Sequence, residues 1–192
     1  MSRERRGAMG PRKRSGEERG EGPPRQKMDH GNKHAVHLAL VQRLRAQAAE
    51  VQRLAAGLDE AALATRSVRD KWSMKELICH FRRMETIFGE RFRRMLAEET
   101  TIVPYDNPDG DELFVAMTKR PCTDVLAEYL SERAALCRTL EGLTPADWHR
   151  KAKHPQFPHY DLHFQVEYMA HHEAHHIYRL FQRRVPFGKL PH

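Results

Sequence analysis

The chain of 192 residues has the size of one domain with an additional segment, and 31% of its residues are charged. It contains no run of roughly 18 apolar residues, which a membrane-spanning helix requires. Its basic N-terminus lacks the apolar stretch of a secretory signal peptide. The three cysteines form no CxxC pair and are odd in number, which is typical of reduced thiols. Together these features predict a cytoplasmic protein without a membrane segment.

The net charge of +7 is concentrated at the N-terminus. Residues 1–32 contain nine Lys/Arg and five Asp/Glu, and therefore more than half of the excess charge. The remaining charge forms no basic stripe interleaved with aromatic residues, which argues against nucleic-acid binding. Residues 1–32 also contain almost no apolar side chains, so we expect a disordered basic tail before a domain at 33–192. This tail is either a contact arm for acidic partners or an over-extended gene start, since Met28 offers an alternative initiator.

The domain opens with a helical pattern that starts at His34. Apolar positions recur at alternating spacings of four and three residues, which is typical of a bundle helix with one buried face. Gly57 marks the expected end of this helix. The positions on the buried face are His37, Val41, Leu44, Ala48, Val51, Ala55 and Leu58.

A second helix is predicted to begin after Ser73 and to run to about Glu98. Serine with a glutamate three residues later, here Glu76, is the pattern of a capping box. The expected core face of this helix comprises Leu77, Phe81, Met84, Phe88, Phe92 and Met95.

Residues 100–110 are predicted to form a loop, because two prolines, an asparagine and a glycine fall within it. A third helical region follows at 111–141 with an interruption near Pro121. Its inward candidates are Leu126, Leu130, Cys137 and Leu140.

A second loop is predicted at 150–160, and the last helix begins after Asp161 and ends near Arg184. No segment shows the period-2 alternation of a strand. The predicted fold class is therefore all-α, with four long helices forming a four-helix bundle.

The last helix contains the segment His171-His172-Glu173-Ala174-His175-His176. Histidines four residues apart lie on one face of a helix, so the segment contains two such pairs. At about 100° per residue, His172 and His176 fall at the border of the apolar face. His171 and His175 fall on the opposite side and are expected to face solvent.

His80 occupies a similar border position on the second helix. Neutral imidazole is a common ligand for divalent zinc, nickel and iron. The pattern therefore favours a metal site formed by His80, His172 and His176. The alternative is that all three are structural histidines at the edge of the core.

Glu173 falls near the middle of the apolar face of the last helix, where an unpaired carboxylate would be unfavourable. A metal-bound water, the second nitrogen of a ligand histidine, or a buried Arg or Tyr would each provide a partner. We expect Glu173 to support the metal ligands or to act as a general base. The alternative is a structural ion pair or hydrogen bond across the bundle.

Residues 172–176 also match the HExxH pattern of zinc proteases. Arg179 and Gln182 stand where the metzincin extension requires glycine and histidine, and no acidic residue follows His176. A metalloprotease therefore remains only a remote alternative.

Two blocks of the chain resemble the DinB-like family of metal-binding four-helix bundles. The first is Lys71-Trp72-Ser73-Met74-Lys75-Glu76-Leu77-Ile78-Cys79-His80, and the second is Ala170-His171-His172-Glu173-Ala174-His175-His176-Ile177. The resemblance covers roughly residues 35–184. It implies the metal ligands His80, His172 and His176, which are the three histidines that the helical wheel selects.

The resemblance also implies a class of function. Relatives in this family include thiol-dependent S-transferases and isomerases that use low-molecular-weight thiols. We therefore expect a divalent-metal enzyme (zinc, nickel or iron(II)) that acts on a small-molecule substrate as a thiol S-transferase or a hydrolase, with a low-molecular-weight thiol as cosubstrate in the first case. The main alternative is a non-catalytic bundle that binds metal or a protein partner. A homodimer is compatible with either function.

Overall fold

The computed structural model describes residues 30–105, 110–188 and 190. The predicted disordered tail at 1–32 lies outside these residues except for its last three, which belong to the first helix. No helix in this described part of the chain is long and apolar enough to cross a lipid bilayer.

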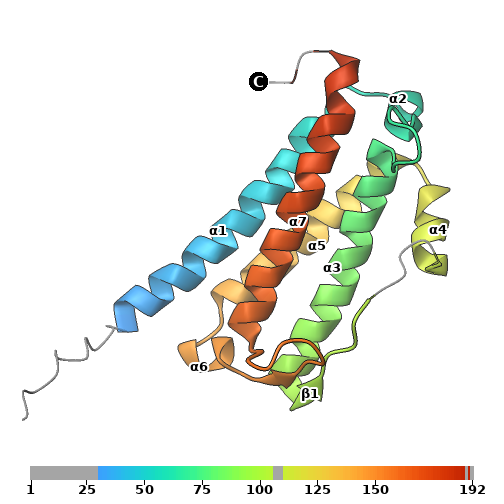
Figure 1. Cartoon of the computed structure of the whole chain (residues 1–192). Helices are drawn as coiled ribbons and strands as arrows, with labels where there is room; N and C mark the ends of the chain where they lie inside the picture. Colours follow the sequence, from blue (N-terminus) through green and yellow to red (C-terminus); the bar gives the residue numbers. More distant parts are fainter. Residues whose placement is uncertain (1–29, 106–109, 189, 191–192) are drawn as a thin grey trace, which may run out of the picture.

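Four long helices form the bundle that the sequence predicts. They are α1 (His30–Ala55), α3 (Met74–Ala97), α5 (Cys122–Glu141) and α7 (Leu162–Arg184). Helix α7 packs between α1 and α3, and α5 packs against the same two helices from the opposite side (Figure 1). Helices α1 and α7 run in one direction and α3 and α5 in the other. Since α1 and α3 each contact both α5 and α7, these two consecutive long helices lie at opposite corners of the bundle.

Because α3 and α5 are parallel neighbours, the chain must return along the bundle between them. The return passes through β1 (Thr100–Thr101) and the short α4 (Glu112–Thr118), which packs against α3. Strand β1 pairs in parallel with β2 (Ala152–Lys153). This pairing ties the segment after α3 to the segment before α7 at one end of the bundle (Figure 1).

Of the two other short helices, α2 (Glu60–Ala64) was not predicted, whereas the segment Thr144-Pro145 predicts the short turn of helix that forms α6 (Pro145–Trp148). Helix α2 begins at Asp59, whose side chain accepts a hydrogen bond from the Ala62 amide. Helix α6 begins with a capping box and has proline at its first position. The strands were also not predicted, because two-residue strands are too short to show an alternating pattern.

The core consists of two apolar clusters along the bundle axis. One surrounds Phe88, Trp148 and Leu162, and the other surrounds Ile78, Tyr129 and Leu180. Every residue predicted for the core face of the second helix is buried. The prediction for α5 was wrong in register by one position. Leu126 and Leu130 are half-buried at the edge of the core, because the buried stripe runs through Val125 and Tyr129.

Candidate metal centre

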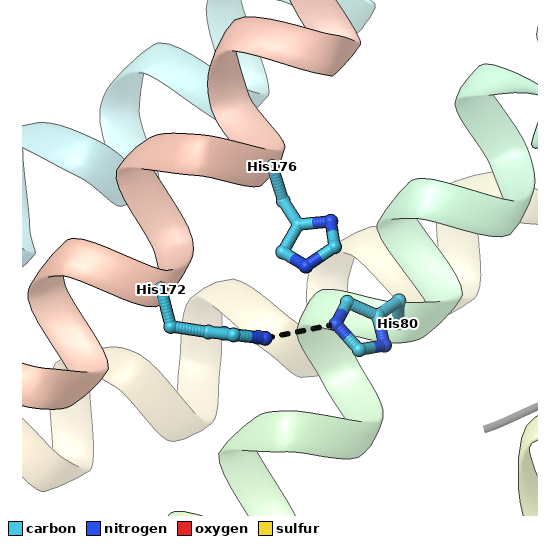
Figure 2. A group of neighbouring side chains, drawn as sticks. All are labelled: His80, His172 and His176. Carbon is cyan, nitrogen blue, oxygen red and sulfur yellow. Dashed lines mark hydrogen bonds between the residues drawn. The ribbon is translucent and has the colours of Figure 1, made fainter. Parts of the chain in front are cut away.

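The three predicted histidines meet between α3 and α7. His80 lies two turns into α3, whose start is fixed by the capping box of Ser73 and Glu76. His172 and His176 are one turn apart on α7, and all three rings point toward one another (Figure 2). Each ring offers one nitrogen, and these three atoms lie within 4.8 Å of one another. Among the described residues, this is the one group whose donor atoms converge in this way.

The spacing of the nitrogens suits a single metal ion. The Nε2 atoms of His80 and His172 are 3.4 Å apart (Figure 2). Two nitrogens that each bind a tetrahedral zinc ion at about 2.0–2.1 Å are separated by about 3.4 Å. The donor set therefore fits the divalent ions that imidazole prefers.

All three imidazoles are held in the neutral form that a metal requires. Burial and the nearby His172 lower the pKa of His80 to about 3. Burial likewise lowers the pKa of His172 to about 4 and that of His176 to about 2. Since only a deprotonated imidazole nitrogen binds a metal, protons compete little for these rings at neutral pH.

Aromatic packing fixes the three rings. The Trp72 ring centre lies 5.1 Å from that of His80 and 6.3 Å from that of His176. The Phe88 ring centre lies 6.0 Å from that of His172. The buried Nδ1 atoms of His80 and His176 have no hydrogen-bond partner in the described part of the protein. The orientation of these two rings at Nδ1 thus depends on packing rather than on hydrogen bonds.

Comparison with known proteins identifies the family and the fold. Residues 43–179 match the model of the DinB superfamily. The chain belongs to this family. No protein of curated function matches the chain in sequence.

A solved structure shares the fold of this DinB-family chain. It is YfiT from Bacillus subtilis, described as a probable metal-dependent hydrolase with an unusual four-helix bundle topology. The two structures superpose with a TM-score of 0.69 over 88% of this chain and 95% of YfiT, at 22% sequence identity. At this identity the likeness concerns the four-helix fold.

The structure places Glu173 behind the three histidines, inside the bundle. Its carboxylate accepts hydrogen bonds from Arg133 at 2.7 and 2.8 Å and from the Tyr129 hydroxyl at 2.6 Å. Arg133 also donates to Glu85 and to the carbonyl of Leu44, so it joins all four long helices. Both oxygens of Glu173 therefore accept hydrogen bonds from Arg133, and Glu173 is not among the residues that line the cleft with the histidines. The structure thus shows, between Arg133 and Glu173, the ion pair across the bundle that the sequence offers as the alternative for Glu173.

The histidines line a cleft of about 570 Å³ between α3 and α7. This volume is within the usual range for small-molecule sites. Both predicted loops contribute to it, through Tyr105 from the first and through His154, Phe157 and Tyr160 from the second. The outward pair, His171 and His175, is exposed, as predicted.

Sequence reasoning missed Arg133 and the aromatic wall of the cleft. Arg133 lies four residues before Cys137 on the buried stripe of α5, so a helical wheel would have revealed a charged residue facing the core. Such a residue predicts a buried acidic partner, and Arg133 has two, Glu85 and Glu173. The loop residues carry no comparable signal, because a loop has no periodicity.

Proposed function

We propose that this DinB-family protein binds a divalent metal ion through His80, His172 and His176 and uses it to act on a small molecule. The observation that carries the proposal is the convergence of three neutral imidazole nitrogens within 4.8 Å at the wall of an open cleft. Imidazole ligands favour zinc, nickel or iron(II) over magnesium or calcium.

Three protein ligands leave at least one coordination position free, where a bound metal lowers the pKa of a water molecule or a thiol. The chain's part is to hold the imidazoles neutral, to keep the site in a half-enclosed cleft and to provide aromatic walls for the substrate. Hydrolysis and thiol S-transfer both suit this arrangement. They differ only in the nucleophile.

None of the three cysteines of the chain is placed to act as the nucleophile. Cys79, Cys122 and Cys137 are all buried, and none lines the cleft. Burial raises the pKa of Cys79 to about 12 and the pKa values of the other two to about 11, so all three remain thiols. Water or a free low-molecular-weight thiol therefore supplies the attacking atom.

Proteolysis of the HExxH type is not favoured. In that mechanism the glutamate after the first histidine must activate water beside the metal. Here the carboxylate of Glu173 is paired with Arg133 and Tyr129 on the far side of the histidines from the cleft.

Metal analysis of the full-length protein, purified without chelators, tests the site. We expect about one divalent ion per chain in the wild type and near none in His80→Ala, which leaves an incomplete ligand set. His154→Ala is the matched control, since His154 lines the same cleft but is not one of the three ligands. A wild-type protein without metal, or equal metal loading of wild type and His80→Ala, contradicts the proposed site.

Activity assays then separate the two reactions. We expect metal-loaded protein to conjugate a reactive electrophile such as 1-chloro-2,4-dinitrobenzene with a small thiol, or to hydrolyse activated esters or amides, and the metal-free protein to do neither. Product analysis distinguishes a thioether from a hydrolysis product. Bound metal without any metal-dependent turnover over a panel of thiols and esters would favour the alternative, a non-catalytic metal- or partner-binding bundle.

A further inference from the structure

The end of the cleft nearest β1 contains the half-buried Arg91, which pairs with no carboxylate of residues 30–105 and 110–188. The Arg91 side chain donates a hydrogen bond of 2.6 Å from Nη2 to the carbonyl of Val103. No carboxylate within the described ranges forms an ion pair with it, whereas Arg93 and Arg94 on the same helix pair with Glu90 and Glu98. Arg91 is half-buried, and this burial lowers the pKa of its guanidinium.

The surroundings of Arg91 are aromatic. Its guanidinium carbon lies 5.5 Å from the centre of the Phe88 ring. Tyr160 and Tyr168 are its nearest electrostatic neighbours. His154 is also close, and burial together with the charge of Arg91 lowers its pKa, so it remains neutral. The guanidinium therefore faces rings and a neutral imidazole, and its remaining donors are available to a ligand.

This end of the cleft is continuous with the candidate metal centre. Phe88 contacts Arg91 on one side and His172 on the other, with a ring separation of 6.0 Å on the second side. The guanidinium and the His172 ring can be no farther apart than the Arg91–Phe88 and Phe88–His172 distances added together. One small molecule can span that separation. Tyr168 also stacks toward His172, with an angle of 11° between the ring planes.

We infer that the cleft binds a small carboxylate-bearing molecule with an apolar or aromatic body, and that Arg91 pairs with its carboxylate. A guanidinium binds a carboxylate through two parallel hydrogen bonds, and a poorly hydrated site strengthens them. The body lies against Phe88, Phe157 and Tyr168, which places the opposite end of the molecule beside the three histidines. This inference names the substrate class for the proposed metal site. Binding of the carboxylate does not depend on the metal, whereas the reaction of the bound molecule rests on the proposed function.

The opposite end of the cleft is also cationic, with Lys71, Arg179 and Arg183. Asp70 lines that end too and supplies negative charge there. This end also has fewer aromatic side chains than the Arg91 end, because Trp72 is the aromatic residue that lines it beside the histidines. We therefore assign the carboxylate to Arg91, and the other end becomes an outcome of the test.

The test uses two probes of nearly the same shape, 3-phenylpropionate and the neutral 3-phenylpropanamide. Both are titrated into full-length, metal-free protein by calorimetry, so that a bond from carboxylate to metal cannot contribute. We expect the carboxylate to bind at least about tenfold more tightly than the amide, because only the carboxylate pairs with the guanidinium. Failure of the wild type to bind the carboxylate, or equal affinity for both probes, overturns the inference without needing any variant.

Variants then locate the preference. Arg91→Gln is expected to lower the carboxylate affinity to that of the amide, while the matched control Arg93→Gln, an exposed position paired with Glu90, keeps the wild-type ratio. Thermal unfolding of each variant verifies that it is folded. A carboxylate preference that persists in Arg91→Gln moves the anion to the Lys71 end and overturns the assignment. The measurement contains no metal, so its result is independent of whether the metal proposal holds.

Discussion

Two groups of histidines lie at different levels of the same bundle and behave differently. The three-histidine site contains His80, His172 and His176. The second group, here the Trp148 cluster, contains His37, His149 and His163 around Trp148. Both groups contain a buried neutral histidine, since burial and neighbouring imidazoles lower the pKa of His37 to about 4. A lowered pKa therefore does not by itself identify a metal site.

Geometry separates the two groups. In the three-histidine site the ring centres are 4.4–5.2 Å apart and the nitrogens converge on the cleft. In the Trp148 cluster His37 lies flat on the indole at 4.3 Å, and the other two rings are 5.3 and 5.9 Å away from it. A stacked ring presents its face to its neighbour, whereas a ligand must present a nitrogen. The same residue type thus serves packing in one group and suits ligation in the other.

The largest expected effect comes from the buried ion pairs of Arg133 behind the three-histidine site, because the acidic contacts of the Trp148 cluster, His149 with Asp161 and His163 with Glu167, are partly exposed. Arg133→Met leaves the carboxylates of Glu85 and Glu173 buried without their cation, so we expect a loss of about 3–5 kcal/mol in the free energy of unfolding. Urea denaturation of the metal-free protein measures it. The control Arg45→Met removes a partly exposed pair with Glu141 and is expected to lose about 1 kcal/mol or less. Equal losses in the two variants would contradict the role of Arg133.

A smaller effect is expected from the Trp148 cluster as the pH falls. Unfolded His37 binds a proton below about pH 6.5, whereas folded His37 stays neutral down to about pH 4. The unfolded state therefore gains protons first, and stability falls between pH 6.5 and 4. The surrounding His34, His149 and His163 oppose protonation of His37, and Asp161 favours it.

His37→Phe keeps a ring on Trp148 but cannot titrate, and Nδ1 of His37 has no hydrogen bond to lose. Between pH 6.5 and 4, the free energy of unfolding should fall in both proteins, and we expect the fall to be roughly 1–3 kcal/mol smaller in this variant than in the wild type. Denaturation at a series of pH values measures the difference. Metal content should be unchanged, and a variant that lost its metal would show that the Trp148 cluster takes part in ligation.

The positions of the three histidines could be predicted well because apolar residues recur periodically along both helices. Residues of α3 and α7 follow the 3.6-residue repeat, so a helical wheel drawn from the amino-acid order places His80, His172 and His176 at the edge of the core. The capping box at Ser73 fixes where α3 begins and therefore where His80 lies on it. The structure confirms these placements.

Other parts of the site could not be predicted in the same way. The pairing of Glu173 with Arg133 depends on which helices are neighbours, and the bundle puts consecutive long helices at opposite corners. Arg91 and the aromatic loop residues come together only through the pairing of β1 with β2, which is two residues long. Contacts of this kind depend on tertiary structure, and a single sequence has no local pattern that encodes them.

The smallest expected effect concerns the outward histidines of α7, and it tests the comparison most strictly. His175 is the nearest exposed imidazole to the site, with its ring 5.3 Å from that of His176 and nearly perpendicular to it. His171 lies beside Arg43, with 3.4 Å between Nδ1 and the guanidinium. Both rings point out of the cleft, so the double variant His171→Ala/His175→Ala should bind metal with an affinity within about twofold of the wild type, as expected for surface substitutions of about 0.5 kcal/mol or less. Competition titration with a chromogenic chelator measures this affinity. A tenfold loss of metal affinity in the double variant would contradict this expectation. It would mean that His175 belongs to the ligand set although its ring points out of the cleft.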